Sequence, residues 1–344
     1  MEVINGVLFH AVGASSAAMC YTPQKKVVGW SWQTYWLAQA FICWLLLPVA
    51  VAFFTIPQLL IVLQEAPAAA MWRSFLLGMA YGVGGTAFGI AIRYVGFSLT
   101  YAIAVGISCV LGTLLPPMVH GTLDLIIKSN GAAYIMSGIV MGALGIAVCG
   151  LAGRNKEKDL ETLHNSSTGF SLSKGLPLCL LAGVLSALYG FSIDQGQPIA
   201  DIASKYGAGN FQVNVVYLFS NSGAFVSTLI YCIYLHQKEK TWQQYGAAGN
   251  TGLGINYTMA ILTGLLWYGQ FFFYGLGHVR MGNNKFSSWA IHMVMLVLFS
   301  TVAGLIMKEW NACSQRTKQL LALALLVLVI AVLLLTYGNY VGSF

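Results

Sequence analysis

The sequence predicts an all-α polytopic membrane protein with ten transmembrane helices, arranged as two inverted five-helix repeats. Three observations predict this fold class. The 344 residues are 58% apolar and only 8% charged, with a mean hydropathy of +0.73, whereas about a quarter of the residues of a soluble protein are charged. The apolar runs are long and continuous, which fits helices rather than barrel strands. A weak internal repeat relates the two halves of the chain.

Ten apolar stretches are each long enough to cross a hydrocarbon core, which takes about 20 residues of helix. Breaks at proline, glycine and charged clusters place them near residues 4–22, 33–56, 70–93, 97–119, 132–152, 175–194, 211–235, 257–279, 286–307 and 318–338. The N-terminus has no basic region and carries Glu2. We therefore interpret it as the first span and not as a signal peptide.

The basic residues favour one orientation in the membrane. When the loops are assigned to alternate sides, twelve of the 17 Lys and Arg residues fall on one side and five on the other. Because Lys and Arg concentrate in cytoplasmic loops, both termini are expected on the periplasmic side. The polar stretch 154–174 is then a cytoplasmic linker between a first repeat, residues 1–153, and a second repeat, residues 175–344.

The internal repeat is clearest between the third and eighth spans. Aligning Gly78 with Gly264 also brings Tyr81 onto Trp267, and it matches three further glycine or aromatic positions. With five spans in each half, the second copy enters the membrane from the opposite side. Such inverted repeats allow one central site to face each side in turn.

The seven cysteines are scattered through apolar runs, with no CxxC pair and no Cys/His cluster at metal-ligand spacing. No metal or cofactor site is therefore expected. The net charge of +7 is interpreted through membrane orientation, and nucleic acid is not an expected partner.

Polar side chains inside membrane spans are costly and are functional candidates by default. In the eighth span Gln270 lies three residues after Trp267 and four before Tyr274, so the three share one helix face. An amide beside flat aromatic rings suits a polyhydroxylated sugar. The alternative is an aromatic stripe that packs against a neighbouring helix. Further candidate substrate-binding residues are Tyr81, Gln195 and Asn221.

Three residues are candidates for proton coupling: His10 in the first span, His292 in the ninth, and Asp194 at the end of the sixth. Histidine, with an ordinary pKa of about 6.5, loads and releases a proton near neutral pH. The alternatives are a neutral histidine held by one hydrogen bond and an interfacial, permanently ionised aspartate. His278 and Arg280 end the eighth span and are expected at the external rim, as a gate or an anchor.

Several stretches carry a resemblance to a known family: FHAVGASSAA (9–18), IRYVGFSLTYAIAVGISCVLGTLLPPMVHGTLD (92–124), LWYGQFFFYGLGHVR (266–280), and SWAIHM with GLIMKEWNA (288–293 and 304–312). They resemble the L-rhamnose/proton symporter family of the drug/metabolite transporter superfamily, along essentially the whole chain. The resemblance implies a ten-helix carrier of the bacterial inner membrane that takes up L-rhamnose, or a related deoxy or pentose sugar, with a proton. The positions inside matching stretches are His10, Trp267, Gln270, Tyr274, His278 and His292, whereas Asp194 lies outside them.

The expected partners are thus a small-molecule sugar, the proton and the lipid bilayer, with H+ as coupling ion and no cofactor. Two alternatives remain, which are sodium-coupled sugar uptake and an exporter or exchanger of cationic or amphipathic metabolites. The first and third spans hold no secure mid-membrane carboxylate, which disfavours a cation exporter. An enzyme is not expected, because no nucleophile and base pair or metal constellation is visible.

Overall fold

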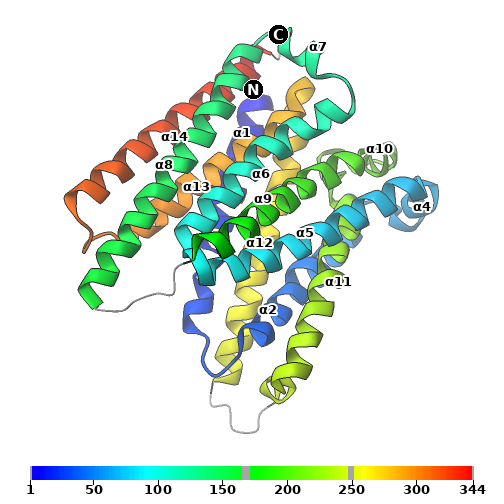
Figure 1. The fold of residues 1–344 in the computed structure, drawn as a ribbon. Coiled ribbons are helices and arrows are strands. Elements are labelled where there is room, and N and C mark those ends of the chain that lie inside the picture. Colours follow the sequence, from blue (N-terminus) through cyan, green and yellow to red (C-terminus); the bar gives the residue numbers. More distant parts are fainter. Residues whose placement is uncertain (1, 165–170, 247–251, 343–344) are drawn as a thin grey trace. The chain divides into compact units, whose positions relative to one another are not determined.

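A computed structural model describes residues 2–164, 171–246 and 252–342 (Figure 1), and within these ranges the chain is helical, with no strand. The α-helices are α1 (Glu2–Met19), α2 (Trp32–Ala40), α3 (Leu47–Thr55), α4 (Leu59–Glu65), α5 (Ala68–Val95), α6 (Phe97–Val119), α7 (Leu123–Ile127), α8 (Ala132–His164), α9 (Leu172–Gln195), α10 (Gln197–Lys205), α11 (Asn214–Glu239), α12 (Leu253–Val279), α13 (Ser288–Ile306) and α14 (Gln315–Val341). Ten helical segments of the described chain are long and apolar enough to cross a membrane. The predicted all-α class and the ten spans are confirmed.

The second span is not a uniform α-helix. Between α2 and α3 the chain forms a π-helix, η2 (Phe41–Leu46), and the amide of Leu47 bonds to the carbonyl of Ile42, five residues back. Such wide turns inside a helix occur frequently at functional sites, because they shift the register of the side chains that follow.

Helix α8 is longer than the predicted fifth span and includes residues 154–164 of the predicted linker. Polar contacts hold this extension against the start of α14. The carboxylate of Asp159 accepts hydrogen bonds from the Ser314 amide at 2.9 Å and from the Thr317 hydroxyl at 2.8 Å. The extension is therefore docked on its own unit, while residues 165–170 lie outside the described ranges.

The chain divides into two compact units. Unit 1 comprises Met1–Ala18, Gly84–Phe191 and Gly277–Phe344, and unit 2 comprises Met19–Val83 and Ser192–Leu276. The fourth, fifth, ninth and tenth spans lie wholly in unit 1, the second and seventh lie wholly in unit 2, and the first, third, sixth and eighth are divided. Each of the first five spans is thus assigned to the two units in the same way as the span five positions later.

In unit 1, small residues let α8 approach its neighbours closely. A side chain added at Gly138 or Gly145 would overlap Leu335 or Leu328 of α14. Glycine rows of this kind bring helix backbones together inside a membrane, where the hydrophobic effect does not drive association.

Gly131, just before α8, gives a direct test of this packing. Its φ is +81°, and a Cβ there would overlap the backbone carbonyl of Gly338, whereas Gly121, with φ of +66°, faces open space. We expect Gly121→Ala to lose about 1–2 kcal/mol, from the backbone conformation alone, and Gly131→Ala to lose clearly more. Thermal unfolding of the purified protein in detergent measures both. Equal losses would show that the contact with Gly338 contributes nothing.

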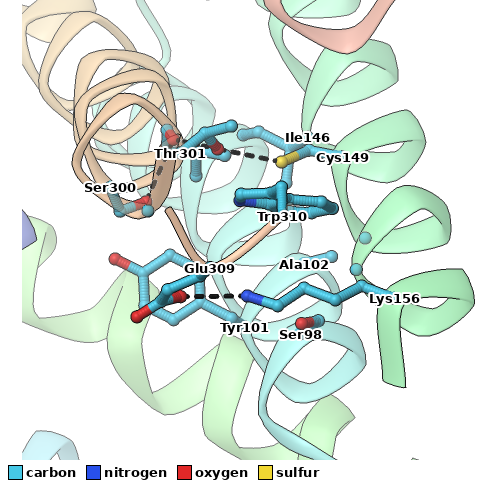
Figure 2. Close-up of a pocket in the computed structure, with 14 residues that line it drawn as sticks. Ser98, Tyr101, Ala102, Ile146, Cys149, Lys156, Ser300, Thr301, Glu309 and Trp310 are labelled. Carbon is cyan, nitrogen blue, oxygen red and sulfur yellow. Dashed lines mark hydrogen bonds and ion pairs between the residues drawn. The ribbon is translucent and has the colours of Figure 1, made fainter. Parts of the chain in front are cut away.

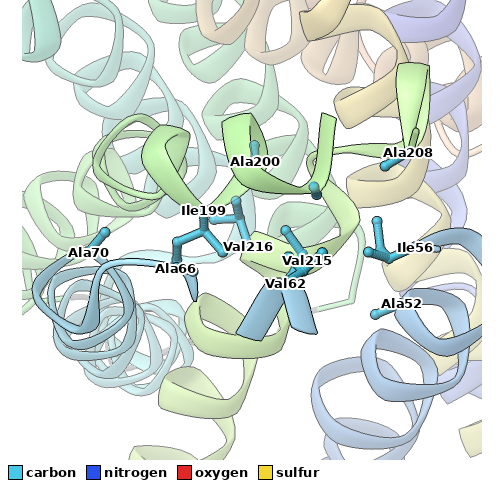
Figure 3. Close-up of a cluster of buried hydrophobic side chains, with 11 residues drawn as sticks. Ala52, Ile56, Val62, Ala66, Ala70, Ile199, Ala200, Ala208, Val215 and Val216 are labelled. Carbon is cyan, nitrogen blue, oxygen red and sulfur yellow. The ribbon is translucent and has the colours of Figure 1, made fainter. Parts of the chain in front are cut away.

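In unit 2, an apolar cluster packs the ends of five helices together (Figure 3). Its buried members come from α3, α4, α5, α10 and α11 and the turns that join them: Ala52, Ile56, Val62, Ala66, Ala70, Ile199, Ala200, Ala203, Ala208, Val215 and Val216. Beside this cluster, Gly78 of α5 and Gly223 of α11 leave room for the Ser220 and Phe75 carbonyls. These contacts fix α5 against α11.

All seven cysteines lie among the described residues, and all are free. Six are buried, and Cys149 is partly buried. They pack as small side chains in the interiors of the two units.

Candidate functional site

An aromatic cluster in unit 2 surrounds Trp267 of α12. The ring centroids of Trp36, Trp44 and Tyr21 lie 5.4, 5.7 and 5.3 Å from that of Trp267, all in edge-to-face geometry. Tyr81 joins the cluster through Trp44, at 6.0 Å. Edge-to-face packing of this kind is favourable for aromatic pairs. The cluster thus gathers rings from the first, second, third and eighth spans at one place.

The cluster depends on a close approach of α2 and η2 to α12 at Gly264. A Cβ at this position would lie 2.6 Å from Cγ2 of Ile42 and 3.2 Å from the carbonyl oxygen of Gln39. Only glycine therefore fits without displacing the π-helix. One turn further along α12, the Trp267 ring meets Trp36 and Trp44, which lie on either side of Gln39 in the sequence.

The other predicted substrate-binding residues of α12 and α11 are also buried. Gln270 is 8% exposed, Tyr274 is 4% exposed, and Asn221 is fully buried. The hydroxyl of Tyr217 donates a hydrogen bond of 2.6 Å to the carbonyl of Phe271, which joins α11 to α12. Asn221 follows Tyr217 by one helical turn, so it lies on the side of α11 that meets α12.

Gln195 and Asp194 lie at the end of α9, where both are half-buried. The Gln195 amide donates to the Asp194 carboxylate at 3.1 Å, and Arg73 donates to the Gln195 carbonyl oxygen at 3.4 Å. Asp194 is also near enough to Tyr274 to interact with it electrostatically. These residues form a polar group with a charge of each sign.

Two histidines meet in the interior of unit 1. His10 of α1 and His292 of α13 are 0% and 2% exposed, and their ring centroids are 6.0 Å apart. A side chain at Gly277 would lie 2.9 Å from Nε2 of His10, so this glycine makes room for the imidazole. Two positive charges at this separation repel by about 3 kcal/mol at an effective dielectric constant of about 20. The two imidazoles thus lie close enough for a charge on one to act on the other.

His278 and Arg280 also belong to unit 1. His278 interacts electrostatically with His10. The Arg280 guanidinium lies 4.7 Å from the centroid of the Phe9 ring and 3.7 Å from the carboxylate of Glu2. Arg280 therefore links the N-terminal part of α1 to the segment that follows α12.

The predicted residues thus separate by chemistry. All six candidates for substrate binding lie in unit 2, together with Asp194, whereas His10, His292, His278 and Arg280 lie in unit 1.

Unit 1 also contains a pocket of about 120 Å³, lined by α6, α8, α13 and the turn that follows α13 (Figure 2). Figure 2 shows the Lys156 ammonium pointing to the Glu309 carboxylate, at 2.9 Å. The same ammonium lies 4.7 Å from the centre of the Trp310 ring. None of the predicted site residues lines this pocket.

Sequence reasoning missed three residues of the aromatic cluster region: Trp36, Gln39 and Trp44. Gln39 could have been found, since it is a carboxamide within an apolar span, the same property that selected Gln270. The two tryptophans carried no such signal, because an aromatic side chain is compatible both with a lipid-facing position and with packing against a neighbouring helix.

Buried imidazole and carboxamide groups within apolar membrane-spanning helices are typical of polytopic membrane transporters. Comparison with known proteins gives the particular family. The model of the L-rhamnose-proton symport protein family (RhaT) matches residues 1–340, and the chain belongs to this family.

Individual relatives agree with this assignment. The L-rhamnose-proton symporter of Escherichia coli O1:K1 / APEC is 31% identical over 330 residues, which cover 95% of both chains. Those of Yersinia pestis (strain Pestoides F) and Yersinia pseudotuberculosis serotype O:3 (strain YPIII) are each 31% identical over 333 residues, or 96% of both chains. The similarity therefore extends over all ten spans.

Proposed function

We propose that the chain imports L-rhamnose, or a closely related sugar, together with a proton, by alternating access across the inner membrane of a bacterium. The relatives named above are L-rhamnose-proton symporters by name. The observation that carries the proposal is the separation of the buried polar groups into an aromatic, amide-bearing set in unit 2 and an imidazole pair in unit 1.

The set in unit 2 has the chemistry that a sugar requires. A pyranose ring presents apolar C–H faces and a rim of hydroxyl groups, and tryptophan rings stack on such faces. Trp267 supplies the ring, and Gln270 and Tyr274 supply hydrogen-bond donors and acceptors along the same helix face. Tyr81, Asn221 and Gln195 complete the proposed set.

The imidazole pair in unit 1 suits the proton. His10 carries it in this proposal, with His292 as the neighbour that shares it, and their mutual repulsion limits the pair to one proton per cycle. Asp194 is the alternative proton carrier. His278 and Arg280 act at the rim, where Arg280 holds the beginning of α1.

We propose further that residues 1–153 and 175–344 are inverted repeats joined by a cytoplasmic linker, 154–174. The identical unit assignment of spans five positions apart supports this relation. So does the presence of Tyr81 and Trp267, which the repeat aligns, in one aromatic cluster. The distribution of Lys and Arg supports periplasmic termini. An alkaline phosphatase fused to the C-terminus should then be active, whereas an inactive fusion would reverse the orientation.

Uptake into proteoliposomes tests the proposed function. We expect labelled L-rhamnose to accumulate when the outside is acidic, and a protonophore to abolish this accumulation. A sodium gradient without a pH gradient should give none. If L-rhamnose neither accumulates nor exchanges between the inside and the outside, the proposal is contradicted. If a sodium gradient alone drives accumulation, the coupling ion is sodium and not the proton.

A further inference from the structure

Gln39 is the most unusual polar side chain of unit 2. It is fully buried, and neither its Oε1 nor its Nε2 has a hydrogen-bond partner among the described residues. Buried carboxamides in folded proteins are almost always bonded, and leaving one unbonded costs stability. An amide kept in this state is therefore expected to have a partner that joins it from outside the chain.

Other unsatisfied polar groups belong to the same part of unit 2. The indole N–H of Trp44 and the hydroxyl of Tyr268 are buried and have no partner in the described part of the chain. Trp44 lies in η2, five residues after Gln39, and Tyr268 lies one turn beyond Gly264, the residue of α12 that touches the Gln39 carbonyl. The Trp267 ring, next to Tyr268 in the chain, packs edge-on against both Trp36 and Trp44.

A second buried glutamine on the same helix shows the difference. Gln33 is 3% exposed, and its amide donates to the Glu239 carboxylate at 2.7 Å and to the Thr241 hydroxyl at 3.0 Å. Gln33 thus has the partners of a structural residue. Gln39, two turns further along the second span, has none among the described residues.

We propose that Gln39, with Trp44 and Tyr268, forms a subsite that binds two adjacent hydroxyl groups of a monosaccharide ring. The carboxamide offers two donors and one acceptor, the indole one donor, and the phenol either role. Adjacent sugar hydroxyls each donate and accept, so they satisfy an amide in the way that water does. The tryptophan rings of the cluster bind the apolar face of the sugar ring. The subsite therefore selects among sugars by the positions of their hydroxyl groups. This inference rests on the proposed sugar transport.

The subsite has a consequence for selectivity. A site built to bond a hydroxyl rejects an analogue without it far more strongly than an apolar pocket does, since buried polar groups are then left unpaired. Wild-type protein should therefore bind at least one monodeoxy analogue of L-rhamnose about 10- to 100-fold more weakly than L-rhamnose.

The test compares Gln39→Leu with the matched control Gln33→Leu, both as full-length protein in detergent. Sugar affinity is measured by calorimetric titration with L-rhamnose and its monodeoxy analogues, and stability by thermal unfolding without sugar. We expect Gln39→Leu to unfold at the wild-type temperature or above, because it removes unpaired atoms, and to bind L-rhamnose at least 10-fold more weakly. It should also lose the discrimination against the deoxy analogue. Gln33→Leu should unfold earlier and keep its affinity.

Two results overturn the subsite: unchanged affinity in Gln39→Leu, or a loss of stability as large as that of Gln33→Leu, which would make Gln39 structural. The identity of the substrate is tested independently of the subsite. If wild-type protein does not bind L-rhamnose, the same titration with other monosaccharides identifies the sugar, and Gln39→Leu must then weaken binding of that sugar. Wild-type protein that binds no monosaccharide would overturn both.

Discussion

Replacing His10 by glutamine is expected to abolish proton-driven accumulation and to leave sugar exchange intact. Glutamine keeps a polar side chain against Gly277, but its amide does not take up and release a proton. A pH gradient of one unit drives about tenfold accumulation for one proton, since one pH unit corresponds to about 1.4 kcal/mol. The accumulation ratio of His10→Gln should fall to about 1. Proteoliposome uptake under an imposed pH gradient, with exchange of labelled for unlabelled L-rhamnose in parallel, measures both properties.

The matched control is His120→Gln, since His120 is exposed in the turn after α6. This variant should accumulate sugar as wild type does. If His10→Gln also accumulates about tenfold, the proton travels elsewhere, and Asp194→Asn becomes the decisive variant. A His10→Gln protein that neither accumulates nor exchanges L-rhamnose has lost sugar transport as well as proton coupling. Thermal unfolding then shows whether this variant is folded.

Replacing Trp267 is expected to weaken sugar binding more than any other single change in the aromatic cluster, because its ring contacts Trp36, Trp44 and Tyr21. Trp267→Phe keeps an aromatic ring, and its affinity should fall about 10-fold. Trp267→Ala should lose about 100-fold, or about 2.8 kcal/mol, and should also lose about 3–5 kcal/mol of stability through the cavity it leaves. Calorimetric titration and thermal unfolding separate these effects.

Trp72→Phe provides the control for this series. Trp72 of α5 is 63% exposed and lies in the same unit, so its replacement should change affinity less than twofold. Unchanged affinity in Trp267→Phe, together with a destabilised Trp267→Ala, would mean that the ring serves packing alone. That result would favour the aromatic stripe against a neighbouring helix as the role of this face of α12.

Most of the fold could be predicted because the membrane imposes it: each span needs a long apolar helix, and every predicted span overlaps an observed one. The details that depend on tertiary contacts could not. The extension of α8 to His164 is docked by hydrogen bonds to Asp159, and a polar sequence alone does not reveal these contacts. The π-helix of the second span likewise lies against Gly264 of α12, a close approach that the sequence alone does not reveal.

The candidate site was predictable in part for the same reason. A polar side chain in a span is visible in the sequence, so His10, His292 and Gln270 were found as individual candidates. The association of the two histidines was not visible, because the contact between His10 and His292 joins residues that are far apart in the chain. Trp36 and Trp44 were missed because only their contacts with Trp267 distinguish them from lipid-facing rings.

The buried cysteines are expected to react little with thiol-labelling reagents in this conformation. Alkylating reagents react with thiolates that solvent can reach, and six of the seven cysteines are buried in this conformation. Two of them adjoin the aromatic cluster, since Cys43 precedes Trp44 and Cys20 precedes Tyr21. The native sequence thus carries its own accessibility probes at the place where the sugar is proposed to bind.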